Sequence, residues 1–350
     1  MPAWSLGAAA ALALVAGVWL AGPPPSIGPG TASGAPPALP APVAAAGQAA
    51  LIWRDGLWLS DPLGRFSRAG GLPRGPARDP AWQSGEGTVA VAVHDQTQAA
   101  TAPDSAPAVS SDLWLVDPAG AARPIVLHEA DGVLLERPAW HPGGEIVYFE
   151  RSTYRTDAGL AGWFTRIEAS ALATGDRTVV VEDGGSPAVS SDGRRLAFNR
   201  TSSGLAELWL RELPSGPPRR LGTPRFAAIA SPRFLPDGRT ILFAAAPLPT
   251  NLARPSAAGP GTSLIEWLGP RRAYAHGPGY GLWLVGIDGS PARQIAAPGL
   301  DDPTVRWLSD GEGALVVDAT GLHRAATDGG QLATVLPFGG AGGFDWLPRR

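Results

Sequence analysis

Side chains that could support metal or covalent chemistry are few in this sequence and lie far apart. Five histidines occur, at His94, His128, His141, His276 and His323. None stands at the HExxH or His-x-His spacing that brings two imidazoles to one zinc ion, and no acidic cluster completes a ligand set. Cysteine is absent, which excludes disulfides, thiolate nucleophiles and Cys-ligated zinc. We therefore expect neither a metal nor a cofactor.

The motifs of nucleophilic and phosphate chemistry are missing as well. The sequence has no G-x-S-x-G elbow and no P-loop. The Ser-Asp-Gly segments at Ser191 and Ser309 resemble a sialidase Asp-box only in part, and they fit turns better. Two carboxylates from separate parts of the chain could still form a glycosidase pair. The residues favour a binding protein and leave an enzyme as the alternative.

The composition indicates a globular protein built from many short strands. Of the 350 residues, 44% are hydrophobic and 17% are charged, which is enough to bury a substantial core. The 46 glycines and 37 prolines are too many for long helices and suit strands joined by tight turns. The net charge of −3 argues against a nucleic-acid surface, where a basic excess is expected.

Two alternating sequence units repeat along the chain. The first has a small residue or Pro, an aromatic or aliphatic residue, a polar turn and an alternating apolar strand. Its copies begin at Pro80, Pro138, Pro187, Pro232 and Val305, with a truncated copy at Phe344. The second, a Leu-Trp-like strand, a turn and a short strand, begins at Gly56, Asp112, Glu207 and Gly281 and in weaker form at Ile167 and Gly321. Each pair of units supplies four short strands, as in the blade of a β-propeller.

The number of inner-strand anchors predicts an all-β, six-bladed propeller of four-stranded antiparallel blades. The anchors are Trp82, Trp140, Val189, Phe234, Trp307 and Trp346. The first copy of the second unit has no partner before it, and the last copy of the first unit is truncated. We therefore expect residues 344–347 to supply the innermost strand of the blade whose outer strands begin near Leu51, which closes the ring and removes free sheet edges.

The repeats resemble those of a known family. The segments PAWHPGGEIVYF from Pro138 and PAVSSDGRRLAF from Pro187 are similar to the TolB-like (WD-repeat-like) propeller repeat, Trp-Ser-Pro-Asp-Gly followed by an apolar strand. Gly143 stands where the motif has Asp. The resemblance covers about residues 51–350 and implies a six-bladed propeller. Similar propellers serve as periplasmic scaffolds, as substrate gates of serine peptidases and as sugar or cofactor sites, so the resemblance leaves the function open.

Three long connections mark one face as the interaction surface. Residues 94–111, 151–163 and 247–280 are each expected between the second and third strands of a blade, which places them on the same face. The third carries arginine and aromatic residues, types enriched at binding hot spots. These tentative partner-binding residues are Trp267, Arg271, Arg272, Tyr274, His276 and Tyr280. An extra strand followed by a solvated loop is the alternative.

The residues that lead into the inner strands are expected to ring the mouth of the central channel on that face. They are Asp79, Arg137, Ser186, Ser231, Asp302 and Asp345. Of these, Asp79, Arg137, Asp302 and Asp345 are the charged candidates. The three acids could hold a cation or a basic group of a peptide, and the alternative is that they bond water and backbone amides.

The N-terminal sequence predicts export. Residues 6–21 are apolar and uncharged, which suits either a membrane anchor or a signal peptide, and cleavage stays open. We divide the chain into an anchor or signal segment (residues 1–21), a Pro/Ala/Gly-rich linker (22–49) and the propeller (50–350).

Together these features predict a monomeric, non-catalytic scaffold outside the cytoplasm, membrane-anchored or secreted. It would bind an envelope protein or a small ligand. The alternative is an extracytoplasmic enzyme or sensor that binds a sugar, peptide or small molecule at the channel mouth.

Overall fold

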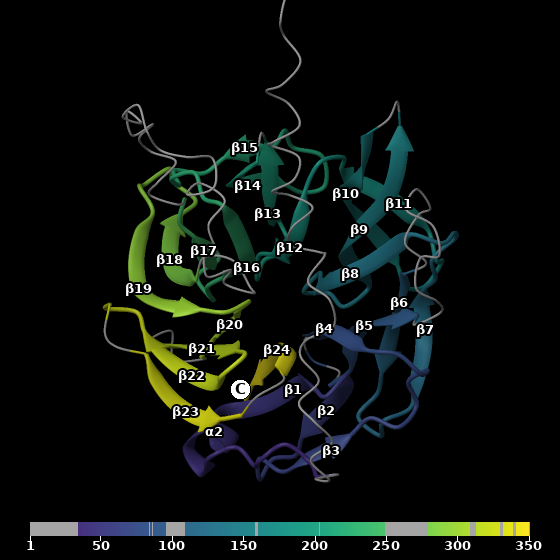
Figure 1. The fold of residues 1–350 in the computed structure, drawn as a ribbon, viewed down its shortest axis with the longest axis vertical. Helices are drawn as coiled ribbons and strands as arrows, with labels where there is room; N and C mark the ends of the chain where they lie inside the picture. Colours follow the sequence, from purple (N-terminus) through teal and green to yellow (C-terminus); the bar gives the residue numbers. More distant parts are fainter. Residues whose placement is uncertain are drawn as a thin grey trace, which may run out of the picture.

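The computed structural model of the chain describes most of the expected propeller. The described residues are 34–83, 85, 87–95, 109–157, 160–202, 204–248, 279–308, 313–329, 332–338 and 341–349. They form six four-stranded antiparallel sheets, arranged as blades around a central axis (Figure 1). The region around this axis, which the inner strands face, is called the central channel. The six-bladed, all-β prediction is therefore confirmed.

Blades 1 to 3 follow one another from the N-terminal side. Blade 1 contains, from the channel outward, β24 (Ala341–Pro348), β1 (Gly47–Trp53), β2 (Gly56–Ser60) and β3 (Phe66–Arg68). Blade 2 contains β4 (Ala77–Trp82), β5 (Val89–Asp95), β6 (Ser110–Val116) and β7 (Ala122–Val126). Blade 3 contains β8 (Val133–Trp140), β9 (Ile146–Asp157), β10 (Leu160–Ala171) and β11 (Arg177–Val181).

Blades 4 to 6 complete the ring with the same order of strands. Blade 4 contains β12 (Gly185–Val189), β13 (Arg195–Ser202), β14 (Leu205–Glu212) and β15 (Arg219–Arg220). Blade 5 contains β16 (Ala228–Phe234), β17 (Thr240–Ala246), β18 (Tyr280–Gly286) and β19 (Arg293–Leu300). Blade 6 contains β20 (Thr304–Trp307), β21 (Gly313–Asp318), β22 (Gly321–Ala326) and β23 (Ala333–Pro337).

Turn residues fix where the strands of a blade reverse. In the turn between β16 and β17, Asp237 Oδ1 accepts hydrogen bonds from the amides of Arg239 (2.8 Å) and Thr240 (3.0 Å). Gly238 adopts φ 63°, a left-handed conformation that glycine takes without strain. The Asp-Gly dipeptides of the repeat therefore serve as turns.

The core lies between neighbouring blades, where the second strands contribute large side chains. Phe149, Phe198 and Phe243, at matching positions of β9, β13 and β17, are fully buried. The inner-strand anchor of blade 3 also reaches back to blade 2, because Trp140 Nε1 donates to the carbonyl oxygen of Ala81 at 3.0 Å. This position of the repeat fills the wedge between two blades, as expected of a propeller.

The two ends of the propeller meet in blade 1, as the repeat count predicted. β24 pairs antiparallel with β1, from Gly47 opposite Pro348 to Leu51 opposite Phe344. In Figure 1 the yellow C-terminal strand lies beside the purple N-terminal one. Phe344 and Trp346 are buried in a cluster with Leu51 of the same blade and Leu315 of blade 6. The closing strand therefore joins blade 1 to blade 6 through side chains as well.

The folded body begins before the predicted boundary at residue 50. A short helix, α2 (Ala41–Ala46), precedes β1, and Leu39 and Ala44 are buried against blade 1. The amide of Leu39 donates to the carbonyl oxygen of Gly64 at 2.9 Å. The last part of the predicted linker therefore packs on the propeller, because its small apolar residues fit closely against it.

The predicted anchor at residues 1–21, and the linker up to residue 33, lie outside the described residues. No helix among the described residues is both long enough and apolar enough to span a bilayer.

The predicted loop at residues 151–163 is a hairpin instead. β9 and β10 each have twelve residues and pair from Ile146 opposite Ala171 to Asp157 opposite Leu160. Thr, Tyr, Trp and Phe are frequent here, and such residues favour extended strands. The insertion therefore lengthens two strands of blade 3.

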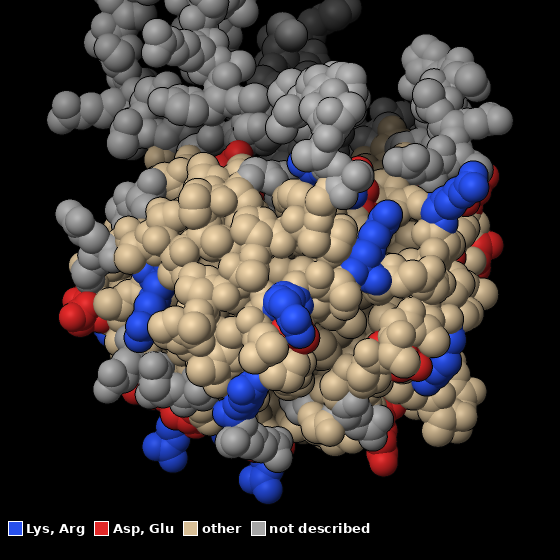
Figure 2. All heavy atoms as spheres, turned by 90° about the horizontal axis from the view of Figure 1, so that it is seen from below, with Lys and Arg blue, Asp and Glu red and all other residues tan. Residues whose placement is uncertain are grey.

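Charged side chains are dispersed over the side of the molecule that carries α2 and β3. Figure 2 shows arginines and acids there in small mixed groups, separated by uncharged surface. The described residues on this side form no continuous basic stripe of the kind that binds nucleic acid.

Replacing the closing anchor tests the importance of the joined ends. We expect Trp346→Ala to lower the free energy of unfolding by about 3–5 kcal/mol, because a buried Trp leaves a cavity between blades 1 and 6. Urea unfolding followed by tryptophan fluorescence measures this loss. Leu63→Ala is the control, because Leu63 is 69% exposed and its truncation should change stability by less than about 0.5 kcal/mol. Equal losses of stability in Trp346→Ala and Leu63→Ala would contradict a stabilising role of the closing strand.

Candidate functional site in the central channel

The inner strands of the blades carry a shared backbone irregularity at the channel. Five non-glycine residues that precede a proline have positive φ: Asp79 (50°), Arg137 (51°), Ser186 (51°), Ser231 (48°) and Asp302 (44°). In blades 2 to 5 the pairing register between the first and second strands shifts at this place. Such a bulge leaves backbone groups without a partner in their own sheet.

Polar side chains at or near these positions form contacts that connect every blade to the next. Each junction has a hydrogen bond or ion pair between an inner part of one blade and the following blade. The contacts are Asp345 Oδ2 with Trp82 N (blades 1 and 2, 2.6 Å), Asp79 Oδ2 with Arg137 N (2 and 3, 3.2 Å), Glu150 Oε2 with Ser186 N (3 and 4, 2.8 Å), Asn199 Nδ2 with Ile229 O (4 and 5, 2.9 Å), Ser231 Oγ with Val305 N (5 and 6, 3.1 Å) and Arg306 Nε with Asp345 Oδ1 (6 and 1). We call this series the interblade ring.

The ion pair between Arg306 and Asp345 closes the interblade ring. Both residues are buried, at 7% and 8% exposure. Besides Arg306, the Asp345 carboxylate accepts the amides of Trp82 (2.6 Å) and Trp346 (2.8 Å). These partners satisfy the buried charge, so the carboxylate is engaged in joining blades.

A second charged group lies at the junctions of blades 2, 3 and 4. Arg137 Nη1 donates to Glu150 Oε1 at 2.6 Å, and the neighbouring carboxylates raise the pKa of Arg137 further. Burial raises the pKa of Asp79 to about 6, although Arg137 acts in the opposite direction. Asp79 is therefore a carboxyl that gains a proton only slightly below neutral pH.

Arg233 differs from the other arginines of the channel. Its charge interacts with those of Arg306, Asp345 and Asp79, which come from blades 6, 1 and 2, so the guanidinium lies where the blades meet. Among the described residues, the hydrogen bond that it donates goes to the carbonyl oxygen of Pro232, at 2.7 Å. Within the described part of the chain, no carboxylate lies at ion-pair distance from it.

The environment of Arg233 is unfavourable for its charge. Burial lowers its pKa to about 9, and the guanidinium of Arg306 adds to this effect. The group is still protonated at neutral pH but is poorly solvated and has few acceptors. An anionic group that entered the channel would relieve both conditions.

Sequence reasoning missed Arg233 and Arg306, although the repeat contains a signal for them. The residue directly before the inner-strand anchor is alanine in blades 2, 3 and 4. In blades 5, 6 and 1 the same position holds Arg233, Arg306 and Asp345. The repeat pattern has a small residue at this position, and three blades depart from it with charged residues.

The candidates predicted for the channel mouth lie at two different positions relative to the inner strands. Asp79, Arg137 and Asp302 have the left-handed backbone conformation next to the prolines. Asp345 lies two residues farther along its strand than Asp79 does, because Gly343 holds the matching position before the anchor. The cation-binding role proposed for the acids stays a prediction, and the oxygens of Asp345 are engaged by an arginine and two amides.

Of the candidates in the third insertion, only Tyr280 belongs to the described residues. It begins β18, and burial, together with the nearby Asp302 carboxylate, raises its pKa to about 12. The structure therefore brings Tyr280 and the channel-mouth residue Asp302 into electrostatic contact. Trp267, Arg271, Arg272, Tyr274 and His276 lie outside the described residues.

The described histidines have local partners. His94 Nε2 lies 2.8 Å from a Glu136 oxygen, and His323 Nε2 lies 3.0 Å from an Asp318 oxygen. His141 Nδ1 accepts the amide of Gly143 at 3.2 Å, next to the turn between β8 and β9. Among the described residues, no three His, Cys, Asp or Glu side chains are grouped so that they could hold a metal ion.

A hollow of about 810 Å³ lies at the end of blade 5 where β16 turns into β17 and β18 turns into β19. It is lined by the turn from Asp237 to Thr240 and by the turn that contains Asp288. The carboxylates of both aspartates accept amides of their own turns. The polar groups of this hollow are thus used locally, which leaves the central channel as the stronger candidate.

Comparison with solved structures identifies the same fold elsewhere. A scan against protein-family models and a search of curated proteins find no match. TolB from Acinetobacter baumannii superposes with a TM-score of 0.59 at 17% identity, covering 87% of this chain and 67% of that one. A chain of the nidogen/laminin complex gives 0.57 at 8% identity, covering 85% and 97%. A protein assigned as TolB from Agrobacterium tumefaciens gives 0.50 at 15% identity, covering 87% and 98%.

At these identities the likeness establishes the fold and not the activity. The chain has the six-bladed propeller of the TolB structures, as its repeats indicated.

Removing one partner of the buried ion pair tests the interblade ring. We expect Asp345→Asn to lower the free energy of unfolding by about 3–5 kcal/mol, because Arg306 keeps a buried charge without a counter-ion. Denaturant unfolding measures the loss. The double variant Asp345→Asn/Arg306→Gln should recover much of it, since no unpaired charge remains. Losses that simply add would show that the two side chains act separately.

The raised pKa of Asp79 predicts a pH dependence of stability. A carboxyl with a pKa of about 6 in the folded chain and about 3.9 in the unfolded chain holds more protons when folded. Its contribution to stability is therefore lost as the pH rises from about 4 to 6. Asp79→Asn should remove this loss while keeping the left-handed backbone, which Asn tolerates. The free energy of unfolding of Asp79→Asn minus that of the wild type should therefore increase as the pH rises from about 4 to 6. A gain that is independent of pH would refute the assignment.

Proposed function

We propose that this protein is a non-catalytic binding scaffold that acts outside the cytoplasm. Its partner docks on the channel face and places an anionic group, such as a carboxylate, beside Arg233. The fold supports a scaffold role, because the chain shares the propeller of TolB structures and of a chain in a nidogen/laminin complex. The apolar residues 6–21 support export, with membrane anchoring as one way to hold the scaffold at the envelope.

The observation that carries the proposal is the charge arrangement around Arg233. The charges of the interblade ring have partners that join blades, whereas among the described residues Arg233 donates only to a carbonyl oxygen and its charge is close to that of a second guanidinium. Charge-assisted hydrogen bonds between a guanidinium and a carboxylate are strong and directional. A carboxylate is therefore the ligand group that this part of the channel is best suited to bind.

Succinate and its uncharged analogue succinamide provide a direct test. We expect succinate to raise the melting temperature of the wild-type protein and succinamide to have no effect. At a concentration one hundred times its Kd, a ligand of the folded state stabilises it by about 2.7 kcal/mol, a readily measured shift. Isothermal titration calorimetry then gives the Kd. A value in the millimolar range fits a carboxylate presented by a protein partner, and a value in the micromolar range fits a free small-molecule ligand.

Two arginine variants in the same blade identify the binding group. Arg233→Gln should abolish the response to succinate. Arg239→Gln should preserve it, because the Arg239 side chain is exposed in the turn between β16 and β17. Equal responses of the two variants, or equal effects of succinate and succinamide, would refute binding at Arg233.

A further inference from the structure

Blade 3 departs from the repeat at one position of the third strand, where the other blades have the aromatic side chain of a Trp or His. In the middle of the third strand, Trp58, Trp114, Trp209 and Trp283 stand opposite matching residues of the second strand. His323 holds this place in blade 6, and Glu168 holds it in blade 3, opposite Phe149. Glu168 is only 3% exposed. A buried carboxylate in place of an aromatic ring is stable only if cations surround it.

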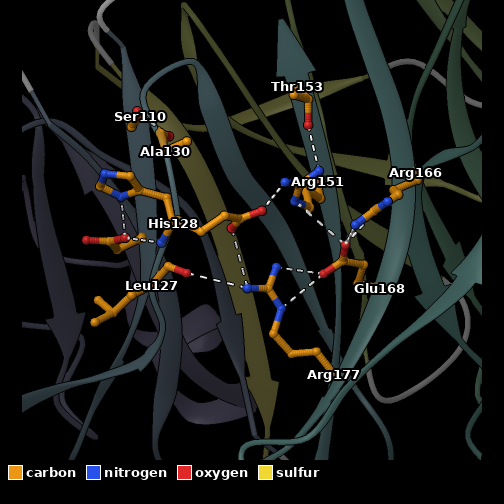
Figure 3. Close-up of polar contacts among 11 residues, drawn as sticks. Ser110, Leu127, His128, Ala130, Arg151, Thr153, Arg166, Glu168 and Arg177 are labelled. Carbon is orange, nitrogen blue, oxygen red and sulfur yellow. Dashed lines mark hydrogen bonds and ion pairs between the residues drawn. The ribbon is translucent and has the colours of Figure 1, made fainter.

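Three arginines supply those cations. Arg166 Nε donates to Glu168 Oε1 at 2.7 Å, Arg177 Nη2 donates to Oε2 at 2.6 Å, and Arg151 Nε lies 3.7 Å from Oε1. Figure 3 shows these guanidinium groups converging on Glu168 from different strands. The buried carboxylate of Glu168 therefore has three cationic partners in this cluster.

The cluster has more positive than negative charge. Glu129, which is half exposed, is a second acid that contacts Arg151 and Arg177. Arg155, from the same face of β9, lies over the ring of Phe164 at 5.3 Å. Four arginines thus accompany two glutamates, an excess of two charges. Counting Asp112 as a third acid reduces the excess to one. Asp112 Oδ1 accepts the backbone amide of His128 at 2.8 Å and lies 2.7 Å from Nδ1 of the same histidine.

Exposed apolar side chains border the arginines. Phe164 is 48% exposed and lies on the same face of β10 as Arg166, two residues away. Val179 is 43% exposed and pairs with Glu168 across the sheet. Leu127 is 55% exposed, and its carbonyl oxygen lies 3.5 Å from Arg177 Nη1. These three account for half of the exposed large hydrophobic side chains among the described residues, which concentrates apolar surface here.

The strand that carries Phe164 and Arg166 also has an open edge. β10 pairs with β11 only from Ile167 to Ser170, whereas it pairs with β9 along its whole length. Within the described part of the chain, the outer edge of β10 from residue 160 to residue 166 therefore has no neighbouring strand. An edge of this length offers unpaired backbone N–H and C=O groups to another extended chain.

We propose that this edge and the surrounding arginines bind an extended, acidic peptide segment of a partner protein. The segment adds as a strand beside residues 160–166 of β10. On the face shared with Arg166, its acidic side chains meet the arginines and an apolar side chain meets Phe164. Neutralising the charge excess selects acidic segments, and the backbone pairing requires an extended one. This site is separate from the channel and does not depend on Arg233.

A symmetric heptapeptide tests both parts of the proposal. Fluorescein-labelled Thr-Glu-Thr-Leu-Thr-Glu-Thr places Glu, Leu and Glu on one face of a strand, whichever way it runs. We expect it to bind the full-length protein in fluorescence anisotropy titrations up to millimolar protein. The version with Lys in place of Glu should bind at least tenfold more weakly. Two versions are N-methylated, one at the threonines and the other at Glu and Leu. They should differ, because only one set of amides faces β10.

Variants of the hairpin locate the binding site. Arg155→Glu and Phe164→Ser change exposed residues and should each weaken peptide binding at least fivefold. Arg166→Gln should do the same. The matched control Arg194→Glu reverses an exposed arginine in a turn of blade 4, and Arg233→Gln changes the channel. Both should leave the peptide affinity within twofold of wild type. Circular dichroism and melting temperatures establish that each variant is folded.

Three outcomes would overturn the proposal. The first is absence of peptide binding by the wild-type protein. The second is equal affinity for the acidic and basic peptides, or for the two N-methylated ones, which would exclude charge selection or strand addition. The third is binding to phosphatidylglycerol vesicles without binding to the peptide, which would assign the arginines and Phe164 to a membrane surface. Loss of peptide binding with an unchanged succinate response would separate this site from the channel.

Discussion

In blades 2 to 5 the arrangement of the inner strands depends on one backbone constraint: a residue with positive φ directly before a proline. The resulting bulge frees the amides of Arg137 and Ser186 from their own sheets, and carboxylates of the preceding blades, Asp79 and Glu150, accept them. Proline favours extended backbone with negative φ in the residue before it, and positive φ is uncommon for residues other than glycine, so the bulge is not a local preference of the chain. The contacts between blades hold these residues in a conformation that is disfavoured locally.

The interblade ring is charged on one side and neutral on the other. From blade 6 through blade 1 to blade 4 its members are carboxylates and arginines, whereas Asn199 and Ser231 make the junctions of blades 4, 5 and 6. Arg233 lies in blade 5, beside the neutral junctions, and among the described residues no carboxylate forms an ion pair with it. Among the described residues, the charges of Glu150, Arg306 and Asp345 thus join blades, and Arg233 is the charge that we propose for a ligand.

The repeats made the fold readable from sequence, because an anchor such as Trp140 and a turn such as Asp237-Gly238 recur with every blade. The functional residues were harder to find because they interrupt the repeat. Arg233 replaces an alanine and Glu168 replaces a tryptophan, and single replacements in a degenerate repeat look like drift. The sequence predicts a loop where blade 3 has a hairpin, since the inserted residues have no counterpart in the other blades. Asp345 directly precedes its anchor, whereas Asp79 lies three residues before Trp82, and such a register depends on strand pairing that the sequence does not state.

The closing pair in blade 1 also determines how the molecule bears a mechanical load. Gly47 and Pro348 lie opposite each other, so the chain enters β1 and leaves β24 at the same end of an antiparallel pair. A force that separates these two ends acts along the hydrogen bonds and breaks them one after another, as in opening a zip. A force between the start of β1 and a partner held on another blade has to shear many contacts at once. The propeller therefore resists tension through its blades and yields to tension between its own ends.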